Sequence, residues 1–188
     1  MIIIGVVGQI ACGKGVLKDY LVKDFGFGSF SLSSIVHQEA QKKGLKEVSR
    51  KDLQDIGDEL RKKYGNDVLA RRAIKFLKKQ GEKHILIEGI RNTGEIEYLK
   101  KLPNFFLIGV KAKRKLRFER LLKRAKPWDP KTWKDFLVVD QRDLGIGQIR
   151  SGQQVGRCLA YCDYILTNNK DKEDFEKKVK KLIKKYLI

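Results

Sequence analysis

Long apolar runs, cysteine and proline are all scarce in this chain, and these shortages exclude several classes of protein. No apolar stretch approaches the ~18 residues that a membrane span requires. Residues 1–8 are apolar, but no basic leader or small-residue cleavage site accompanies them, so we expect a strand and not a signal peptide. The three cysteines are too few and too scattered for a disulfide framework, which predicts a reducing, cytoplasmic location.

Groups of metal ligands and domain linkers are also missing. Cys158 and Cys162 are one helical turn apart, but no nearby histidine or further cysteine completes a zinc site, so both are interpreted as core or helix-face residues. No internal repeat, low-complexity linker or Pro/Gly/Ser run marks a boundary. The sequence therefore predicts that residues 1–188 form a single domain, long enough for a sizeable core.

Acidic residues are scarce, above all in one segment. The formal net charge is +19, and residues 111–134 contain eleven lysines and arginines against two acids. Such an excess favours a polyanionic ligand, which could be the phosphates of a nucleotide or RNA. The alternative is a solvated lysine-rich surface, and it suits the C-terminal tail, where lysines alternate with acids.

The strongest signal that is present lies at the start of the chain. The apolar run Ile2–Val7 is followed by GQIACGKGV, residues 8–16, and then by a helical pattern. A strand, the pattern G-x-x-x-x-G-K and a helix are the arrangement of a phosphate-binding P-loop, in which backbone N–H groups and a helix N-terminus face the anion. We predict that ATP is bound by Gly8, Gln9, Ile10, Ala11, Cys12, Gly13, Lys14, Gly15 and Val16, with Lys14 reaching the terminal phosphates.

The eighth position of this motif departs from the usual pattern. Most P-loops place Ser or Thr there so that the hydroxyl binds Mg²⁺, whereas this chain has Gly15 followed by Val16. Binding of phosphate by backbone amides does not need the hydroxyl. The departure leaves metal binding to other groups, and it keeps open a nucleotide-binding protein with little turnover.

Further apolar runs predict the sheet. Strands are expected at Ile2–Val7, His84–Ile87, Phe105–Val110 and Tyr164–Leu166, with a fifth around Phe27–Leu32. Continuous apolar runs favour a parallel sheet that is covered on both faces. Helical patterns separate the runs, so the sequence predicts βαβ units in a three-layer α/β fold, with the P-loop at the carboxyl edge of the sheet.

A second motif follows the His84–Ile87 run, where the chain reads IEGIR, residues 87–91. In P-loop proteins, a carboxylate at such a strand end positions Mg²⁺ or its waters. We therefore predict that Glu88 holds the metal through water. Gly89 permits close approach, and Arg91 is suited to bind a phosphate with two parallel hydrogen bonds.

Together with the P-loop, the stretch from Ile87 to Pro130 resembles the D-G-x-R segment, fourth strand and lid of the nucleoside monophosphate kinase superfamily. It is most similar to deoxynucleoside-monophosphate-kinase-like, dephospho-coenzyme A kinase-like and adenylate-kinase-like members. The resemblance implies a three-layer αβα P-loop NTPase fold with a five-stranded parallel sheet, an ATP site and a mobile basic lid. Residues of approximately 125–157 would form the lid, with a short helix around Thr132–Val139. Trp128 and Trp133 are expected to pack the lid, and the alternative is that they stack on a base.

The resemblance also implies roles for individual side chains. Gly8, Gly13, Lys14 and Gly15 match the phosphate loop, Glu88 matches a strand-end acid, and Arg91 matches the arginine that holds the acceptor's phosphate. Arg120 and Arg124 match lid-base arginines, and Arg142 a returning lid arginine. Many relatives have arginine where this chain has His37, a weaker and pH-dependent phosphate partner, so Arg61 is kept as a substitute for the acceptor site.

These observations predict an ATP- and Mg²⁺-dependent kinase that acts on a small phosphorylated acceptor, foremost a nucleoside or deoxynucleoside monophosphate. A dephospho-coenzyme A kinase-like enzyme is one alternative. A basic RNA-associated P-loop ATPase is another, although no RNA-reading motif is present and aromatic residues do not interleave with the basic run as stacking platforms would. No membrane partner is expected.

Overall fold

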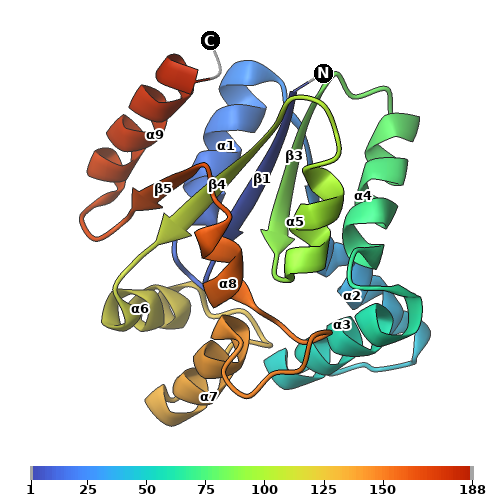
Figure 1. The fold of residues 1–188 in the computed structure, drawn as a ribbon. Coiled ribbons are helices and arrows are strands. Elements are labelled where there is room, and N and C mark those ends of the chain that lie inside the picture. Colours follow the sequence, from blue (N-terminus) through green and yellow to red (C-terminus); the bar gives the residue numbers. More distant parts are fainter. Residues whose placement is uncertain (1, 187–188) are drawn as a thin grey trace.

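The computed structural model describes residues 2–186 and contains a five-stranded sheet (Figure 1). Its strands are β1 (Ile2–Gly8), β2 (Gly28–Ser31), β3 (His84–Ile90), β4 (Phe105–Lys111) and β5 (Tyr164–Thr167). Every pairing is parallel, in the order β2-β3-β1-β4-β5. The predicted parallel sheet is confirmed, and each predicted run lies in or overlaps one of these strands.

The central strand shows why continuous apolar runs predict this sheet. Side chains alternate between the two faces of a strand. Ile3 and Val7 of β1 belong to one core cluster, and Ile4 and Val6 belong to the other. All four are at most 1% exposed. Because both faces are covered, no position of this strand needs a polar residue.

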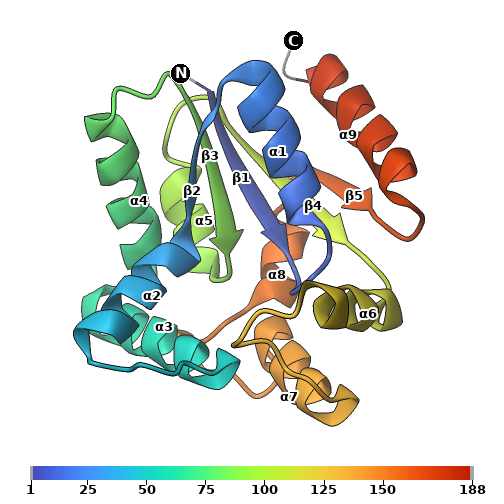
Figure 2. The ribbon, with the colours of Figure 1, turned by 180° about the vertical axis from the view of Figure 1, so that it is seen from behind.

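Helices cover both faces of the sheet (Figures 1 and 2). One face carries α1 (Lys14–Phe25) and α9 (Lys172–Tyr186), and the other carries α4 (Val68–Lys79), α5 (Thr93–Leu99) and α8 (Val155–Ala160). This is the predicted three-layer arrangement. The sequence predicts an amphipathic last helix from Phe175, Val179, Leu182, Ile183, Tyr186 and Leu187. The Tyr186 side chain and all of Leu187 lie outside what the structure describes.

Four more helices lie beyond the carboxyl ends of the strands (Figure 2). They are α2 (Leu32–Lys42), α3 (Arg50–Tyr64), α6 (Arg114–Arg124) and α7 (Trp133–Leu144). The pattern predicted a helix only over Thr132–Val139, whereas α7 runs on to Leu144 and ends at Gly145, whose φ of 99° suits glycine. The sequence did not predict α2, α5 and α8. Helices α5 and α8 have seven and six residues, which is too short to show a periodic hydrophobic pattern.

Packing at this end explains both tryptophans. Trp133 contacts Phe118 and Phe136 with ring centroids 5.2 and 5.3 Å apart, and Trp128 lies 4.7 Å from His37. Within residues 2–186, no helix is long and apolar enough to cross a membrane.

The three cysteines are unpaired thiols. Burial raises the pKa of Cys158, and burial, with the charge of Asp163 second, raises the pKa of Cys162 to about 12. Both groups are therefore held in the protonated, unreactive form.

Candidate functional site

The phosphate loop connects β1 to α1 through two left-handed residues. Ala11 has a φ of 57° and Gly13 a φ of 104°, and Gly13 caps the N-terminus of α1. A side chain at Gly13 would also collide with Asn168, whose amide nitrogen donates to the Cys12 carbonyl at 3.0 Å. Glycine at this position is thus required by both backbone conformation and space.

Lys14 lies directly over this loop. Its Nζ donates to the carbonyl oxygens of Gly8 and Gln9 at 2.6 and 2.9 Å. The side chain lines the neighbouring cleft, as do residues 10–15. A β-carbon added at Gly15 would meet nothing within 4 Å. The loop therefore presents a charged amine and an unobstructed main chain to the cleft, which fits a phosphate chain.

The cleft itself has a volume of about 750 Å³ and lies at the carboxyl ends of the strands. The predicted site residues among its lining are Ile10, Ala11, Cys12, Gly13, Lys14, Gly15, His37, Glu88, Arg91, Arg120 and Arg124. Gly8, Gln9 and Val16 belong to the loop but do not line the cleft. The structure thus brings together residues that are more than a hundred positions apart in the chain.

Two predicted arginines lie elsewhere. Arg61 is 3% exposed, and its Nε donates to Glu95, which is fully buried, at 2.9 Å. Arg142 pairs with Asp55 and Asp58 of α3 at 2.6 and 2.8 Å. Neither residue lines the cleft. In this structure both arginines bind carboxylates between elements of the fold.

Glu88 stands at the end of β3. Its side chain is 17% exposed and lies 3.4 Å from Lys18 Nζ, and its register partner on β2 is Ser31. The hydroxyls of Ser31 and Ser33 are 2.9 Å apart and also line the cleft. Among the described residues, no group of three or more His, Cys, Asp or Glu could hold a metal. A single carboxylate beside hydroxyls fits Mg²⁺, which keeps most of its waters and relies on substrate phosphates.

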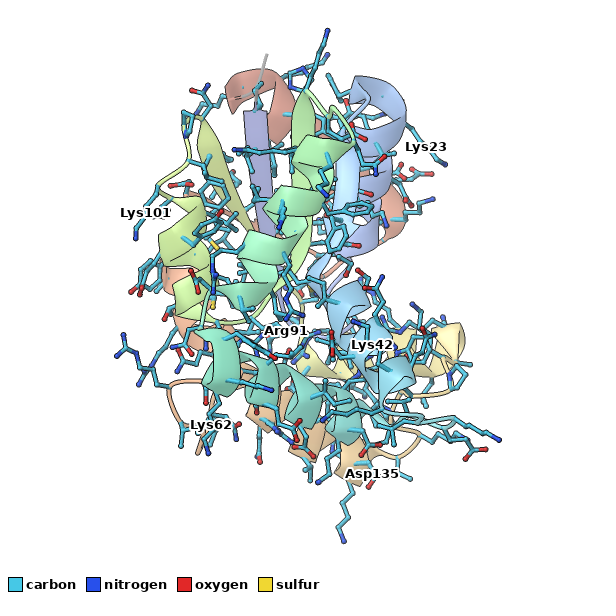
Figure 3. The ribbon with its side chains drawn as sticks, turned by 90° about the vertical axis from the view of Figure 1, so that its right-hand side faces the viewer. Lys23, Lys42, Lys62, Arg91, Lys101 and Asp135 are labelled. Carbon is cyan, nitrogen blue, oxygen red and sulfur yellow. The ribbon has the colours of Figure 1, made fainter. Side chains whose placement is uncertain are left out.

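Two buried aspartates of α7 bind the phosphate loop and hold it in place. Asp140 accepts two hydrogen bonds from the buried Arg117, at 2.5 and 2.9 Å, and one from Gln9 of the loop. Asp143 accepts from the backbone N–H of Ile10 at 3.3 Å and pairs with Arg91. Figure 3 shows Arg91 between the sheet end and α3. The two carboxylates therefore hold the P-loop, α6 and Arg91 in one arrangement.

Arg50, which the sequence did not indicate, forms the opposite wall. Its side chain is 11% exposed and pairs with Asp129 at 2.7 Å. Asp129 also binds Arg124 at 2.6 and 2.9 Å. Arg50 Nε is buried without a hydrogen-bond partner in the described part of the chain. Ser49 and Asp52 form a capping box that could have marked the start of α3, but no local signal shows which way Arg50 points.

Charges in this wall act on one another. Burial, with the charge of Arg91 second, lowers the pKa of Arg50. Burial, followed by the charges of Arg50 and Lys126, lowers the pKa of His37 from its ordinary 6.5. His37 is therefore neutral at pH 7 and contributes a ring beside Trp128 instead of a positive charge.

Comparison with known proteins supports the fold and leaves the acceptor open. A family model described as "AAA domain" matches residues 7–135. A UPF0200 protein of Hyperthermus butylicus is 31% identical over 97% of this chain and 93% of its own length. Shikimate kinase from Acinetobacter baumannii, in complex with shikimate, has a TM-score of 0.59 at 16% identity, covering 100% of this chain and 96% of that one. Dephospho-CoA kinase from Campylobacter jejuni has a TM-score of 0.50 at 16% identity, covering 98% and 96%.

Proposed function

Because the chain belongs to the UPF0200 proteins and to the AAA-domain family of P-loop kinase-like proteins, we propose that it is an ATP-dependent phosphotransferase. The acceptor proposed is a small phosphorylated molecule, foremost a nucleoside or deoxynucleoside monophosphate. One observation carries the proposal: a single cleft joins the phosphate loop to Arg50 and Arg91 beside an aromatic wall. Residues 1–188 would act as a single kinase domain.

The donor side is proposed to be the P-loop with α6. The amides of residues 11–15 and the Lys14 amine would hold the terminal phosphates of ATP. Arg120 and Arg124 reach the cleft from α6 and would neutralise charge on the same phosphates. Mg²⁺ would supply further charge neutralisation at the phosphates, and Glu88 would orient its waters.

The acceptor side is proposed to be the wall opposite. Arg91 and the unsatisfied Nε of Arg50 would bind the acceptor's phosphate, and the His37–Trp128 pair would flank its base. An oxygen of the acceptor phosphate then attacks the γ-phosphorus, and the bond to the β-phosphate oxygen breaks to release ADP. No protein nucleophile is required, because positioning and charge neutralisation dominate this reaction.

Coupled measurement of ADP release tests the proposal. The panel contains the common ribo- and deoxynucleoside monophosphates and dephospho-coenzyme A, each with ATP and Mg²⁺. We expect release that depends on a monophosphate. Release only with dephospho-coenzyme A would move the acceptor to the alternative class. ATP binding without turnover on any acceptor would contradict the phosphotransferase proposal and leave a nucleotide-binding protein.

A further inference from the structure

The basic segment, residues 111–134, divides its positive charges between two uses. Its arginines are taken up by the fold. Arg114 and Arg117 bind Asp140, Arg124 binds Asp129, and Arg120 donates to the Asn168 carbonyl. Apart from Arg120 and Arg124, which also line the cleft, the arginines of this segment therefore offer little charge to a partner.

The lysines of the same segment behave differently. All of them are exposed, and none forms an ion pair with a carboxylate of residues 2–186. They are Lys111, Lys113, Lys115, Lys123, Lys126, Lys131 and Lys134. Elsewhere some lysines pair with an acid one turn away, as in Lys51–Asp55 and Lys178–Asp174, whereas others, such as Lys177 and Lys181 on α9, form no ion pair in the described part of the chain. The basic segment is therefore set apart by its lack of acids: it contains only Glu119 and Asp129, and Asp129 is buried and paired with Arg124.

Aromatic packing brings together two segments that carry several of these lysines. Phe118 of α6 contacts Trp133 at 5.2 Å, which joins the first turn of α7 to α6, and both views of the fold show these helices side by side (Figures 1 and 2). Trp133 lies between Lys131 and Lys134 in the chain and is 42% exposed. On α6, Lys115 precedes Phe118 by three residues and so shares its face. We call Lys115, Phe118, Lys131, Trp133 and Lys134 the α6–α7 surface.

We propose that the α6–α7 surface binds a single-stranded polynucleotide. Unpaired lysines gain affinity for a chain of phosphodiesters by releasing its counterions. An exposed indole among them offers a face on which an unpaired base can stack. Every base has such an aromatic face, so stacking does not depend on sequence. The linear sequence did not indicate such interleaving, because the Phe118–Trp133 contact that draws the two helices together is tertiary. An anionic membrane fits less well, because Leu121 of α6 is buried and the 46% exposed Leu122 leaves little apolar surface on this helix for insertion.

This site is independent of the proposed phosphotransfer. Arg120 and Arg124 of α6 line the cleft, whereas Lys115, Lys131 and Trp133 do not. A variant that disables the cleft, such as Lys14→Ala, should therefore keep its affinity for a polynucleotide. Loss of turnover and loss of polynucleotide binding can thus be measured separately.

Fluorescence anisotropy with a labelled oligouridylate of about 20 nucleotides tests the electrostatic part. The triple variant Lys115→Gln, Lys131→Gln, Lys134→Gln is compared with Lys177→Gln, Lys181→Gln, Lys184→Gln on α9, which removes the same charge from exposed positions outside the basic segment. We expect the first variant to lose about tenfold in affinity. The slope of the logarithm of its binding constant against the logarithm of salt concentration should be smaller in magnitude by roughly two. The α9 variant should stay within about twofold of the parent chain. Equal losses would show that net charge alone attracts RNA, and would overturn the proposal.

Trp133→Leu tests the stacking part. We expect about a tenfold loss for the oligouridylate and no change for inorganic polyphosphate, which has no bases. The melting temperature and the circular dichroism spectrum establish that the variant is folded. Equal effects on both probes, or none on either, would contradict base stacking at Trp133. Vesicles of phosphatidylserine that bind the parent chain and displace the RNA would reassign the surface to a membrane.

Discussion

The two walls of the cleft are built in opposite ways. The phosphate-loop wall is one continuous stretch, residues 10–15, that offers mainly backbone groups and one amine. The facing wall takes Arg50, Arg91, His37 and Trp128 from four separate segments, and both arginines are paired with buried aspartates. A local wall recognises what all triphosphates share. An assembled wall can be changed one side chain at a time, so we expect it to determine which acceptor is used.

The largest effect should come from the loop wall. Lys14→Ala removes the one amine that lies over the P-loop and should lower turnover by roughly a thousandfold, as expected for a group aimed at transition-state charge. The melting temperature should change little, since Lys14 bonds only to its own loop, at the carbonyls of Gly8 and Gln9 and the Sγ of Cys12. The control is Lys23→Ala, an exposed lysine near the other end of α1 that Figure 3 shows far from Arg91. Equal turnover in the two variants would remove Lys14 from the mechanism.

The support beneath the loop wall can be broken separately. Asp140→Ala leaves the buried guanidinium of Arg117 without its carboxylate and should lower the free energy of unfolding by about 3–5 kcal/mol. Denaturant unfolding measures this. The control is Glu39→Ala. Glu39 pairs with Lys42 and Arg72 and is more exposed than Asp140, so its loss should cost less than about 1 kcal/mol. Similar costs for the two variants would mean that Asp140 does not hold α6 and the loop together.

A substitution in the wall opposite the phosphate loop should raise KM for the acceptor and leave KM for ATP nearly unchanged. Arg50→Gln removes a charged hydrogen-bond donor, so KM for the acceptor should rise by about tenfold to a hundredfold while KM for ATP stays nearly constant. Steady-state kinetics with each substrate varied in turn measures the split. Arg71→Gln on α4, outside the cleft, is the matched control. A parallel rise in both KM values would place Arg50 outside a dedicated acceptor wall.

The smallest effect concerns acid stability. The pKa of His37 is lowered in the folded protein by burial, then by Arg50 and Lys126. As pH falls, the unfolded chain therefore binds a proton at His37 at a higher pH than the folded chain does. His37 thus destabilises the fold as pH falls below 6.5, the ordinary pKa of histidine. His37→Gln should reduce the loss of melting temperature between pH 7.5 and pH 5.5 (approximate bounds of that window). An identical pH dependence in both proteins would show that His37 is not shielded from protonation.

Local patterns were sufficient for part of the site. The residues on either side of the P-loop, Glu88 and Arg91 form recognisable patterns in the sequence, and all three regions line the cleft. Arg61 and Arg142 are surrounded by equally suggestive residues, yet the fold pairs them with Glu95 and with the aspartates of α3. Sequence spacing shows that an arginine is present, but the direction of its side chain depends on which carboxylate the fold places within reach.

By itself, the sequence determined the parallel sheet, the layers over it and the phosphate loop, because each of these follows from periodicity or from glycines at short spacing. Only the tertiary structure decided that Arg50 and Arg91 line one cleft, that Trp128 packs against His37, and that Phe118 of α6 contacts Trp133 of α7. Those contacts join residues far apart in the chain. They depend on how helices pack at the sheet's end, and pairwise packing of distant helices leaves no local trace in the sequence.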